Sequence, residues 1–209
     1  MNITYRKMNR GDYQVVKKLI RQAWFDEYVF KDKVKDDYAK AYLRTYLADS
    51  NYRMVACDDD KVVGFLLGKH RKIKASVKFC NLFILFWIKF KFLFTKPGRR
   101  KLKIQSKTEN VNSRLLKKHE SYLVNELALF IIDEEYRGKG IGTTLENKFT
   151  SYLKENGEEY MYLFSDTYSD YEFYERKGYI RGGELVVDFD IEGEKEFPLP
   201  IYFIYYKKF

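Results

Sequence analysis

The sequence predicts a single α/β domain over residues 1–209, and three observations support this prediction. Two apolar, β-prone runs, Tyr52–Cys57 and Val62–Gly68, stand on either side of the polar turn DDDK and are typical of a hairpin. An apolar strand that ends at Ile132 leads through a glycine-rich turn into helix-spaced apolar residues from Ile141 onward. A chain of 209 residues, 45% of them hydrophobic, can also bury one sizeable core.

The segment before the hairpin predicts one strand and two helices. Ile3–Met8 has the β-prone composition of a first strand. A helix follows, because apolar residues recur at helical spacing at Val15, Val16, Leu19, Ile20, Ala23 and Trp24. A second helix is predicted over Asp36–Leu47.

The last third of the chain predicts further strands and helices in alternation. Tyr122–Ile132 is apolar at both alternating sets of positions, which predicts a central strand covered on both faces. The helix from Ile141 is expected to end near Gly157, and a short helix should stop at Gly178, where glycine favours a C-terminal cap. The remaining predicted strands are Tyr160–Ser165, Glu184–Ile191 and Ile201–Tyr206.

Basic residues are concentrated in one segment. The net charge is +9, yet between Lys69 and Lys118 stand sixteen lysines and arginines and a single acid, Glu109. The rest of the chain is therefore acidic overall. We interpret residues 70–120, approximately, as a basic and aromatic insert in a mildly acidic domain, rather than as part of a uniformly basic nucleic-acid-binding protein.

The composition argues against metal and disulfide chemistry. The two cysteines, Cys57 and Cys80, and the two histidines, His70 and His119, show no metal-ligand spacing. The first residues lack the apolar segment of a signal peptide, and no run of about 18 apolar residues could span a bilayer. We therefore expect a cytoplasmic protein without a bound metal.

Glycines at alternate positions, Gly138, Gly140 and Gly142, follow Arg137 and surround Lys139. They lie between a strand and a helix, where backbone N–H groups at the helix N-terminus have no intrahelical partner. Such a turn can hold a phosphate, because glycine lets an anion approach the backbone. The spacing fits neither a Walker loop nor a Rossmann fingerprint. A tight turn that binds nothing is the alternative.

The stretch YRGKGIG, with Arg137-x-x-Gly140-x-Gly142 at its centre, resembles the pyrophosphate-binding loop of the GCN5-related N-acetyltransferases (GNAT). The preceding ELALFIIDEEYRG is similar to the strand and turn of that family. Phe173–Tyr179, FYERKGY, is similar to its later helix-and-strand signature. The resemblance implies a mixed, mostly antiparallel central sheet flanked by helices, with the insert between the third and fourth strands.

The resemblance also implies acetyl-CoA as the cofactor and assigns residues to it. The loop would hold the pyrophosphate, and backbone groups of the preceding strand would pair with the pantetheine arm. Thr167 stands where the family often has an asparagine that contacts the pantetheine, and its hydroxyl can still donate and accept a hydrogen bond. The implied cofactor-binding residues are Phe130, Ile131, Ile132, Arg137, Gly138, Lys139, Gly140, Ile141, Gly142, Thr143 and Thr167.

Two further residues are implied for catalysis. Tyr174 occupies the position of a family tyrosine near the thioester sulfur and would protonate the departing thiolate. Its alternative is a packing aromatic. Glu126 matches an acidic residue often found on this strand and would accept a proton from the attacking amine. A structural ion pair, with water as the base, remains the alternative for Glu126.

The insert contains the dense aromatic run Phe79–Lys103. We expect a helical lid or subunit interface in which Phe86 and Trp87 are buried, and an amphipathic helix on a membrane surface is the less favoured alternative. Nucleic-acid binding is not expected, because the aromatics cluster with aliphatic residues instead of being spaced as stacking platforms. A basic rim would favour an acceptor that carries an anionic group.

The sequence thus predicts an acetyl-CoA-dependent N-acetyltransferase that acts on a primary amine of a small molecule or peptide and forms, as one option, a homodimer. Two alternatives stay open. One is a non-catalytic acyl-CoA-binding module that keeps the phosphate loop, and the other is a peripheral membrane protein that acts through the basic insert.

Overall fold

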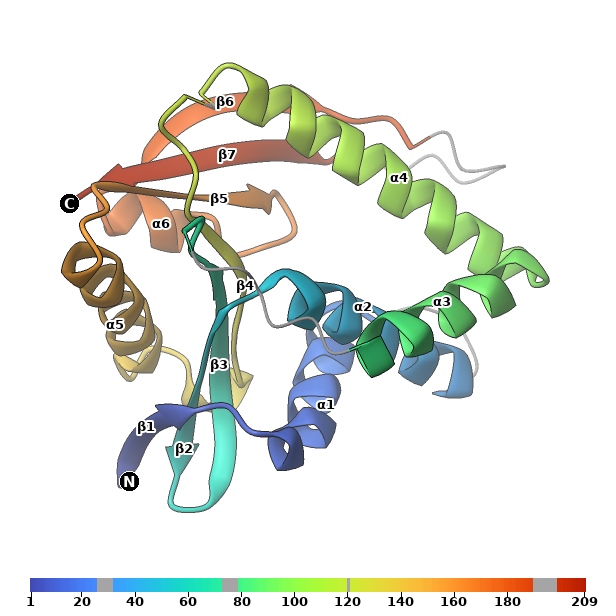
Figure 1. Ribbon diagram of the computed structural model, residues 1–209, viewed down its shortest axis with the longest axis horizontal. Coiled ribbons are helices and arrows are strands. Elements are labelled where there is room, and N and C mark those ends of the chain that lie inside the picture. Colours follow the sequence, from blue (N-terminus) through green and yellow to red (C-terminus); the bar gives the residue numbers. More distant parts are fainter. Residues whose placement is uncertain (26–31, 73–78, 120, 190–198) are drawn as a thin grey trace. The chain divides into compact units, whose positions relative to one another are not determined.

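The computed structural model describes residues 1–25, 32–72, 79–119, 121–189 and 199–209. They form two compact units, each built from two separate stretches of chain (Figure 1). The first unit comprises Met1–Ile88 and Leu127–Glu158, and the second comprises Lys89–Glu126 and Glu159–Phe209.

The first unit is built on the predicted hairpin. β2 (Tyr52–Asp58) and β3 (Lys61–Lys69) are antiparallel, and β1 (Ile3–Lys7) pairs with the outer side of β2. β4 (Glu126–Ile132) lies on the other side of β3. A β-carbon at Gly64 in β3 would come within 2.6 Å of the Ile132 side chain, so glycine permits this close approach of β3 and β4.

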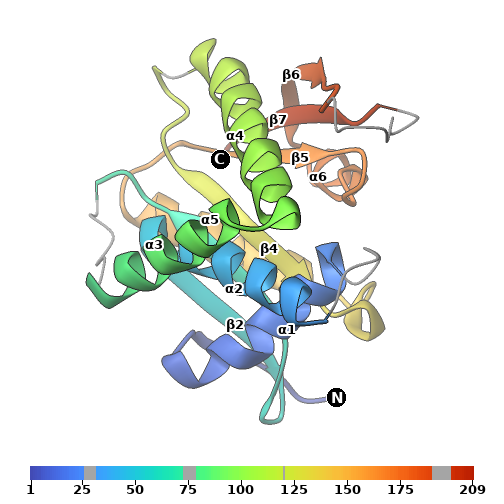
Figure 2. The same cartoon turned by 90° about the vertical axis from the view of Figure 1, so that its right-hand side faces the viewer.

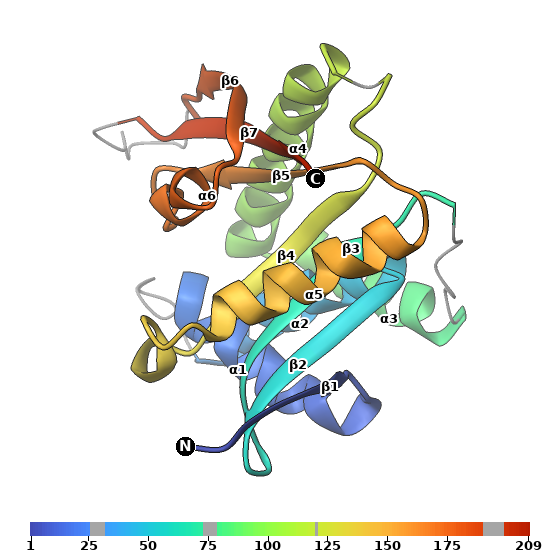
Figure 3. The same ribbon diagram turned by 90° about the vertical axis from the view of Figure 1, so that its left-hand side faces the viewer.

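Helices cover both faces of this part of the sheet. α1 (Tyr13–Trp24) and α2 (Asp32–Asp49) pack on each other and on β3 (Figure 2). α5 (Ile141–Glu155) crosses the opposite face of β2 and β3 (Figure 3). A β-carbon at Gly68 on β3 would come within 2.4 Å of the fully buried Phe149 ring of α5. Glycine at this position therefore lets α5 pack closely against β3.

The second unit contains a three-stranded antiparallel layer with β7 (Ile201–Lys208) between β5 (Tyr160–Asp166) and β6 (Ile180–Val186). α4 (Lys96–Lys117) packs on β6 and β7 (Figure 2). Their shared core is apolar and consists of Val111, Leu115, Leu123, Tyr162, Val187, Phe189 and Ile204.

The strand order of the whole sheet is β1-β2-β3-β4-β5-β7-β6. The pairings β1–β2, β2–β3, β5–β7 and β6–β7 are antiparallel, whereas β4–β5 is parallel, through Glu126 and Tyr162. The predicted mixed, mostly antiparallel sheet flanked by helices is therefore confirmed.

Three predictions about β4 and β6 need correction. β4 begins at Glu126 rather than Tyr122, because the backbone N–H groups of Tyr122 and Leu123 bond back to His119 in a turn. β4 is also not covered equally on both faces, because buried and half-buried residues alternate along it. β6 begins at Ile180 instead of Glu184, because antiparallel pairing with the long β7 continues to Tyr206.

The insert is folded as two helices, where one was predicted. α3 (Phe79–Leu93) follows the aromatic run, and α4 accounts for the basic segment after it. The sequence marks the start of α4, because the Thr95 hydroxyl caps it by accepting from the Gly98 N–H and Pro97 lies in its first turn. No helix in the described part of the chain is long and apolar enough to cross a bilayer.

Candidate functional site

The glycine loop lies in the first unit, between β4 and α5. Gly138 and Gly140 have left-handed backbone φ angles of 72° and 79°, which side-chain-bearing residues adopt only with strain. Gly140 is the residue immediately before α5, whereas Gly142 lies in the first turn of the helix. Only the first two glycines are therefore required by backbone conformation.

The N-terminus of α5 presents several backbone N–H groups in sequence. The first turn, Ile141 to Thr143, has no intrahelical acceptors, and the first helical bond runs from the Thr144 N–H to the Gly140 carbonyl at 3.0 Å. Gly140 supplies no side-chain cap. A β-carbon at Gly138 or Gly140 would meet no atom within 4 Å, so the space over the loop is open. These features fit a phosphate group.

Two cations flank the loop but are held by neighbouring groups. The Arg137 Nε donates to the Ile132 carbonyl at 3.3 Å, which folds the exposed arginine back along the end of β4. The Lys139 Nζ donates to the Glu135 carbonyl at 2.7 Å and lies 4.8 Å from the centre of the Tyr136 ring. Both side chains thus keep positive charge at the loop's rim.

Tyr136 anchors the loop and was missed by the sequence predictions. Its hydroxyl donates to Asp58 at the end of β2, at 3.1 Å, and the Lys61 ammonium lies 5.2 Å from its ring centre on one side of the hairpin turn. Desolvation, followed by the hydrogen bond to Asp58, raises the pKa of Tyr136. Its position directly before Arg137 in the motif was the signal available, but its partners are distant in sequence.

The predicted pantetheine strand, β4, alternates in exposure at the residues assigned to the cofactor. Ile131 is buried in the first unit, whereas Phe130 and Ile132 are half-buried. Past Ile132, the Asp133 N–H bonds to the Val63 carbonyl at 2.9 Å, so β4 is fixed to β3 up to the start of the loop.

Glu126 lies in the second unit, at the first residue of β4. Its side chain is half-buried, and its Oε2 accepts from the Tyr162 hydroxyl at 3.4 Å, a long contact. Tyr162 is the residue opposite it in the parallel β4–β5 pairing. The carboxylate is thus neither deep in the core nor fully in water.

Tyr174 also lies in the second unit, on the short helix α6 (Glu172–Arg176). It is half-buried in an aromatic cluster, with ring centres 5.4 Å from Phe173, 5.5 Å from Tyr179 and 6.1 Å from Tyr205. These rings restrict the direction of its side chain.

A polar network holds α6 through the residue next to Tyr174. The Glu175 carboxylate accepts from the Tyr205 hydroxyl at 2.8 Å and pairs with Arg181 of β6. The Arg181 hydrogen bond lowers the pKa of Glu175, and burial together with Glu175 raises the pKa of Tyr205 to about 12. Sequence reasoning missed this network, because its members come from α6, β6 and β7.

Thr167, the remaining predicted cofactor residue, has a structural contact at the end of β5. Its N–H donates to the Ile201 carbonyl at 3.1 Å, and its hydroxyl accepts from the Ile201 N–H at 3.2 Å. The hydroxyl proton can still be donated elsewhere. Beside it, burial raises the pKa of Asp166, although Ser169 donates to that carboxylate at 2.9 Å.

Other places in the described residues hold less chemistry. No group of three or more His, Cys, Asp or Glu side chains in the described ranges could hold a metal ion. A hollow of about 340 Å³ on α4 contains no residue predicted for catalysis or cofactor binding, and its lining is Ser106, Lys107, Asn110, Val111 and Val187.

Solved structures similar to this chain include several acetyltransferases. A polyamine N-acetyltransferase of Drosophila melanogaster that forms N-acetylagmatine is 12% identical, with a TM-score of 0.59 and full coverage of both chains. An agmatine N-acetyltransferase variant gives 10% and 0.60, again with full coverage of both. The PaiA N-acetyltransferase of Thermoplasma acidophilum, solved with coenzyme A, gives 16% and 0.52 over both full chains.

The sequence comparisons decide the family. No curated protein matches this sequence. The family described as the acetyltransferase (GNAT) family matches residues 16–179, which include the glycine loop and the helix that carries Tyr174. Together with the mixed sheet and the left-handed glycines before α5, this match shows that the chain belongs to the GNAT family of acyltransferase enzymes.

Proposed function

We propose that this protein is an acetyl-CoA-dependent N-acetyltransferase that acts on a primary amine. The observation that carries the proposal is the loop itself. Gly138 and Gly140 adopt left-handed conformations, no atom would contact a β-carbon on either, and the first N–H groups of α5 follow directly. A chain that only needed to turn would not require an open row of N–H groups flanked by Arg137 and Lys139.

In this proposal the glycine loop and the strand before it bind the cofactor. The backbone from Arg137 to Thr143 holds the pyrophosphate, and the rim cations add attraction that is screened by salt. Backbone groups of Phe130, Ile131 and Ile132 pair with the pantetheine arm in the manner of an added strand. Thr167 offers its hydroxyl proton to the same arm.

Glu126 and Tyr174 carry the proton transfers in this proposal. The bound thioester provides an acetyl carbon that is activated for attack by an amine. Glu126, or water, takes a proton from the ammonium form of the acceptor so that its nitrogen can form the C–N bond. A backbone N–H of β4 stabilises negative charge on the acetyl oxygen. Tyr174 gives its phenolic proton to the sulfur as the C–S bond breaks, and the second proton that the attacking nitrogen loses restores the phenol.

The acceptor class is proposed from two considerations. The structural neighbours include a polyamine acetyltransferase and an agmatine acetyltransferase, which makes small amines the first compounds to test. The basic segment between Lys69 and Lys118 instead favours an amine that also carries an anionic group. An acceptor panel should therefore contain agmatine, spermidine and amino acids, so that the two kinds of amine compete directly.

Two measurements test the proposal together. Calorimetric titration with coenzyme A reports binding at the loop, and release of free thiol from acetyl-CoA reports turnover with each amine. We expect binding and amine-dependent thiol release. Binding without thiol release for any amine would identify a non-catalytic acyl-CoA-binding module, and no binding at millimolar coenzyme A would refute the enzyme proposal.

A further inference from the structure

α3 exposes large apolar side chains that the sequence predicts to be buried. Phe86 is 61% exposed and Trp87 is 46% exposed, which contradicts the expected lid, because a lid would bury these two residues within the chain. Ring contacts connect neighbours along the helix, with centres 6.4 Å apart for Phe86 and Trp87 and 4.9 Å apart for Phe90 and Phe94. Among the described side chains of α3 and its C-terminal end, the exposed apolar ones are Phe83, Phe86, Trp87, Phe90, Leu93 and Phe94.

These six residues form a continuous stripe along one helix. At 3.6 residues per turn they fall within roughly 120° of its circumference. The buried residues Ile88 and Phe92 lie on the opposite side. Lys89 and Lys91 stand at the two edges of the stripe, each about 100° from its centre. We call the six residues and these two lysines the aromatic stripe.

The helix that carries the stripe, α3, is joined to α4 by a corner of defined geometry. A β-carbon at Gly98 would come within 2.4 Å of the Phe92 backbone, so α3 and α4 meet there at backbone contact. The Thr95 cap closes the start of α4, and Arg99 donates to the Leu93 carbonyl at 3.1 Å. The corner therefore has one preferred geometry rather than a loose linker.

The start of α4 carries charge of the wrong sign for its helix. Its first turn contains no acidic residue, and Lys96 and Arg99 are exposed there. A helix N-terminus carries partial positive charge, so it favours anions and disfavours cations. An external anionic surface would reverse this penalty, because the cations and the helix dipole would then both be attracted to it.

We propose that the aromatic stripe and the first turn of α4 dock onto an anionic membrane surface. The apolar side chains enter the boundary between headgroups and acyl chains, and the two edge lysines reach outward to lipid phosphates. This arrangement requires no spanning helix. It is independent of the acetyltransferase proposal, because none of its residues is assigned to the cofactor or to catalysis.

The charges favour a membrane over other occupants. A second copy of the chain would bring Lys89, Lys91, Lys96 and Arg99 against the same four cations in a two-fold interface. Single-stranded nucleic acid would match the charge, but it needs separated rings on which bases stack, whereas this stripe is a continuous apolar band. Anionic lipid satisfies both the charge and the apolar face.

Fluorescence of Trp87 tests the proposal directly. Because Trp24 is the other tryptophan, Trp24→Phe leaves Trp87 as the sole reporter. We expect its emission to shift to shorter wavelength when vesicles of phosphatidylcholine with about 30% phosphatidylglycerol are added, and the protein to sediment with them. Pure phosphatidylcholine vesicles should bind it much less, and added salt should weaken binding to the anionic vesicles.

Paired variants separate docking from folding. Phe86→Ser with Phe90→Ser should lower vesicle partitioning about tenfold for each ring removed, with an unchanged melting temperature, since both side chains are exposed. Tyr168→Ser with Ile180→Ser removes two other exposed apolar side chains, in the second unit, and should leave partitioning unchanged.

Four results would overturn the proposal. They are absence of vesicle binding, equal binding to neutral vesicles, and retained binding by the Phe86/Phe90 variant. The fourth is a shift of Trp87 emission to shorter wavelength without lipid, which grows with protein concentration while the molecular mass doubles. That result would assign the stripe to a second copy of the chain. A shift with single-stranded DNA but not with vesicles counts as absence of vesicle binding.

Discussion

Gly140 and Gly157 are a matched pair of residues at the two ends of α5. Both have left-handed φ angles, 79° and 74°, and a β-carbon at either would meet no atom within 4 Å. Alanine at each should therefore cost a similar amount of stability, about 1–2 kcal/mol, from backbone strain alone. Only Gly140 borders the proposed phosphate site.

We predict that Gly140→Ala weakens coenzyme A binding at least tenfold, about 1.4 kcal/mol, because its methyl group enters the space over the helix N-terminus. Gly157→Ala should bind coenzyme A like the unchanged protein. Titration calorimetry measures both affinities, and urea unfolding measures both stabilities. Equal loss of affinity in the two variants would mean that strain in α5, not the phosphate site, causes the effect.

Tyr174 is predicted to act when the thiolate departs. Tyr174→Phe should lower kcat about 10²-fold and leave the dissociation constant of coenzyme A nearly unchanged, because the hydroxyl is needed in the transition state. The neighbouring Tyr171→Phe is the control, since Tyr171 packs its ring on Phe203 at 5.1 Å. A Tyr174→Phe enzyme with full kcat would return this residue to a packing role within its aromatic cluster.

Glu126 is predicted to accept a proton from the acceptor amine. Glu126→Gln should lower the rate most at low pH, where more of the amine is protonated and the base is needed most. The pH–rate profile of kcat/KM measures this dependence. A profile of unchanged shape and height would assign the carboxylate to its contact with Tyr162 and leave water as the base.

At the scale of elements, a carboxylate joins β1 to α1. Asp12 is buried, accepts from Arg6 through both oxygens at 2.8 Å, and caps the backbone N–H of Asn9 at 2.7 Å. The Arg6 hydrogen bonds lower the pKa of Asp12 in the folded protein. Its stabilisation is therefore complete above the unfolded pKa, about 3.9, and is lost as pH falls through the folded pKa.

We predict that Asp12→Asn lowers the free energy of unfolding by about 1–2 kcal/mol at pH 7, since Arg6 is partly exposed and screened. The difference from the unchanged protein should begin to shrink below about pH 4, where the unfolded carboxyl is protonated, and should disappear as pH falls through the lower folded pKa of Asp12. Urea unfolding at both pH values measures it. Asp49→Asn, which removes an exposed pair with Lys69, should matter little at either pH. A gap that stayed constant with pH would exclude the charge of Asp12 as its cause.

The elements differ in how far the sequence could predict them. The β2–β3 hairpin and the turn into α5 depend on residues adjacent in the chain, so local sequence patterns were sufficient to predict them. α4 was missed, although Ile104, Val111 and Leu115 have helical spacing, because lysines and arginines dominate the segment. The limits of β6 depend on its pairing with β7, a contact that no local pattern contains.

The same distinction holds for the candidate site. The glycine loop is contiguous, and its motif predicted where the left-handed residues and the helix start would lie. The contact of Tyr136 with Asp58 joins residues 78 positions apart, and Tyr205 reaches Glu175 across 30 positions. Such contacts arise only when strands pair, and one sequence without its fold does not specify them.

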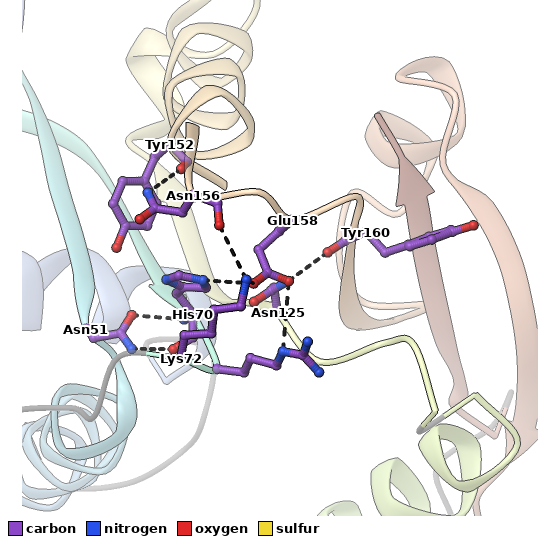
Figure 4. A network of polar contacts seen from close by, with 9 residues as sticks. Asn51, His70, Lys72, Asn125, Tyr152, Asn156, Glu158 and Tyr160 are labelled. Carbon is purple, nitrogen blue, oxygen red and sulfur yellow. Dashed lines mark hydrogen bonds and ion pairs between the residues drawn. The ribbon is translucent and has the colours of Figure 1, made fainter. Parts of the chain in front are cut away.

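At the scale of the whole molecule, Glu158 holds the two stretches of the first unit together (Figure 4). Its buried carboxylate contacts His70 Nε2 at 3.2 Å and Lys72 Nζ at 2.8 Å, both beyond the end of β3. His70 is fixed in turn, because its backbone N–H donates to the Asn51 side chain at 2.9 Å. Glu158 follows α5, so this cluster ties the end of α5 to the end of β3.

We predict that Glu158→Ala lowers the free energy of unfolding by about 3 kcal/mol, because it removes a buried carboxylate and leaves His70 without its partner. The adjacent Glu159→Ala removes an exposed pair with Lys208, at 3.8 Å, and should cost about 0.5 kcal/mol or less. Denaturant unfolding compares them. If the two variants were equally stable, the cluster would contribute no more than a surface ion pair.

The division of each unit between two stretches of chain also constrains the order in which the protein can fold during its synthesis. Residues 1–88 leave the ribosome long before Leu127–Glu158, which provide β4 from Leu127 onward and all of α5. Until α5 is made, the face of the β2–β3 hairpin that α5 covers therefore stays exposed. The apolar side chains of the insert emerge during that same interval. A nascent chain that ends before Glu158 therefore exposes both the hairpin face that α5 covers and the apolar side chains of the insert. We expect chaperones to bind most strongly to chains of this length.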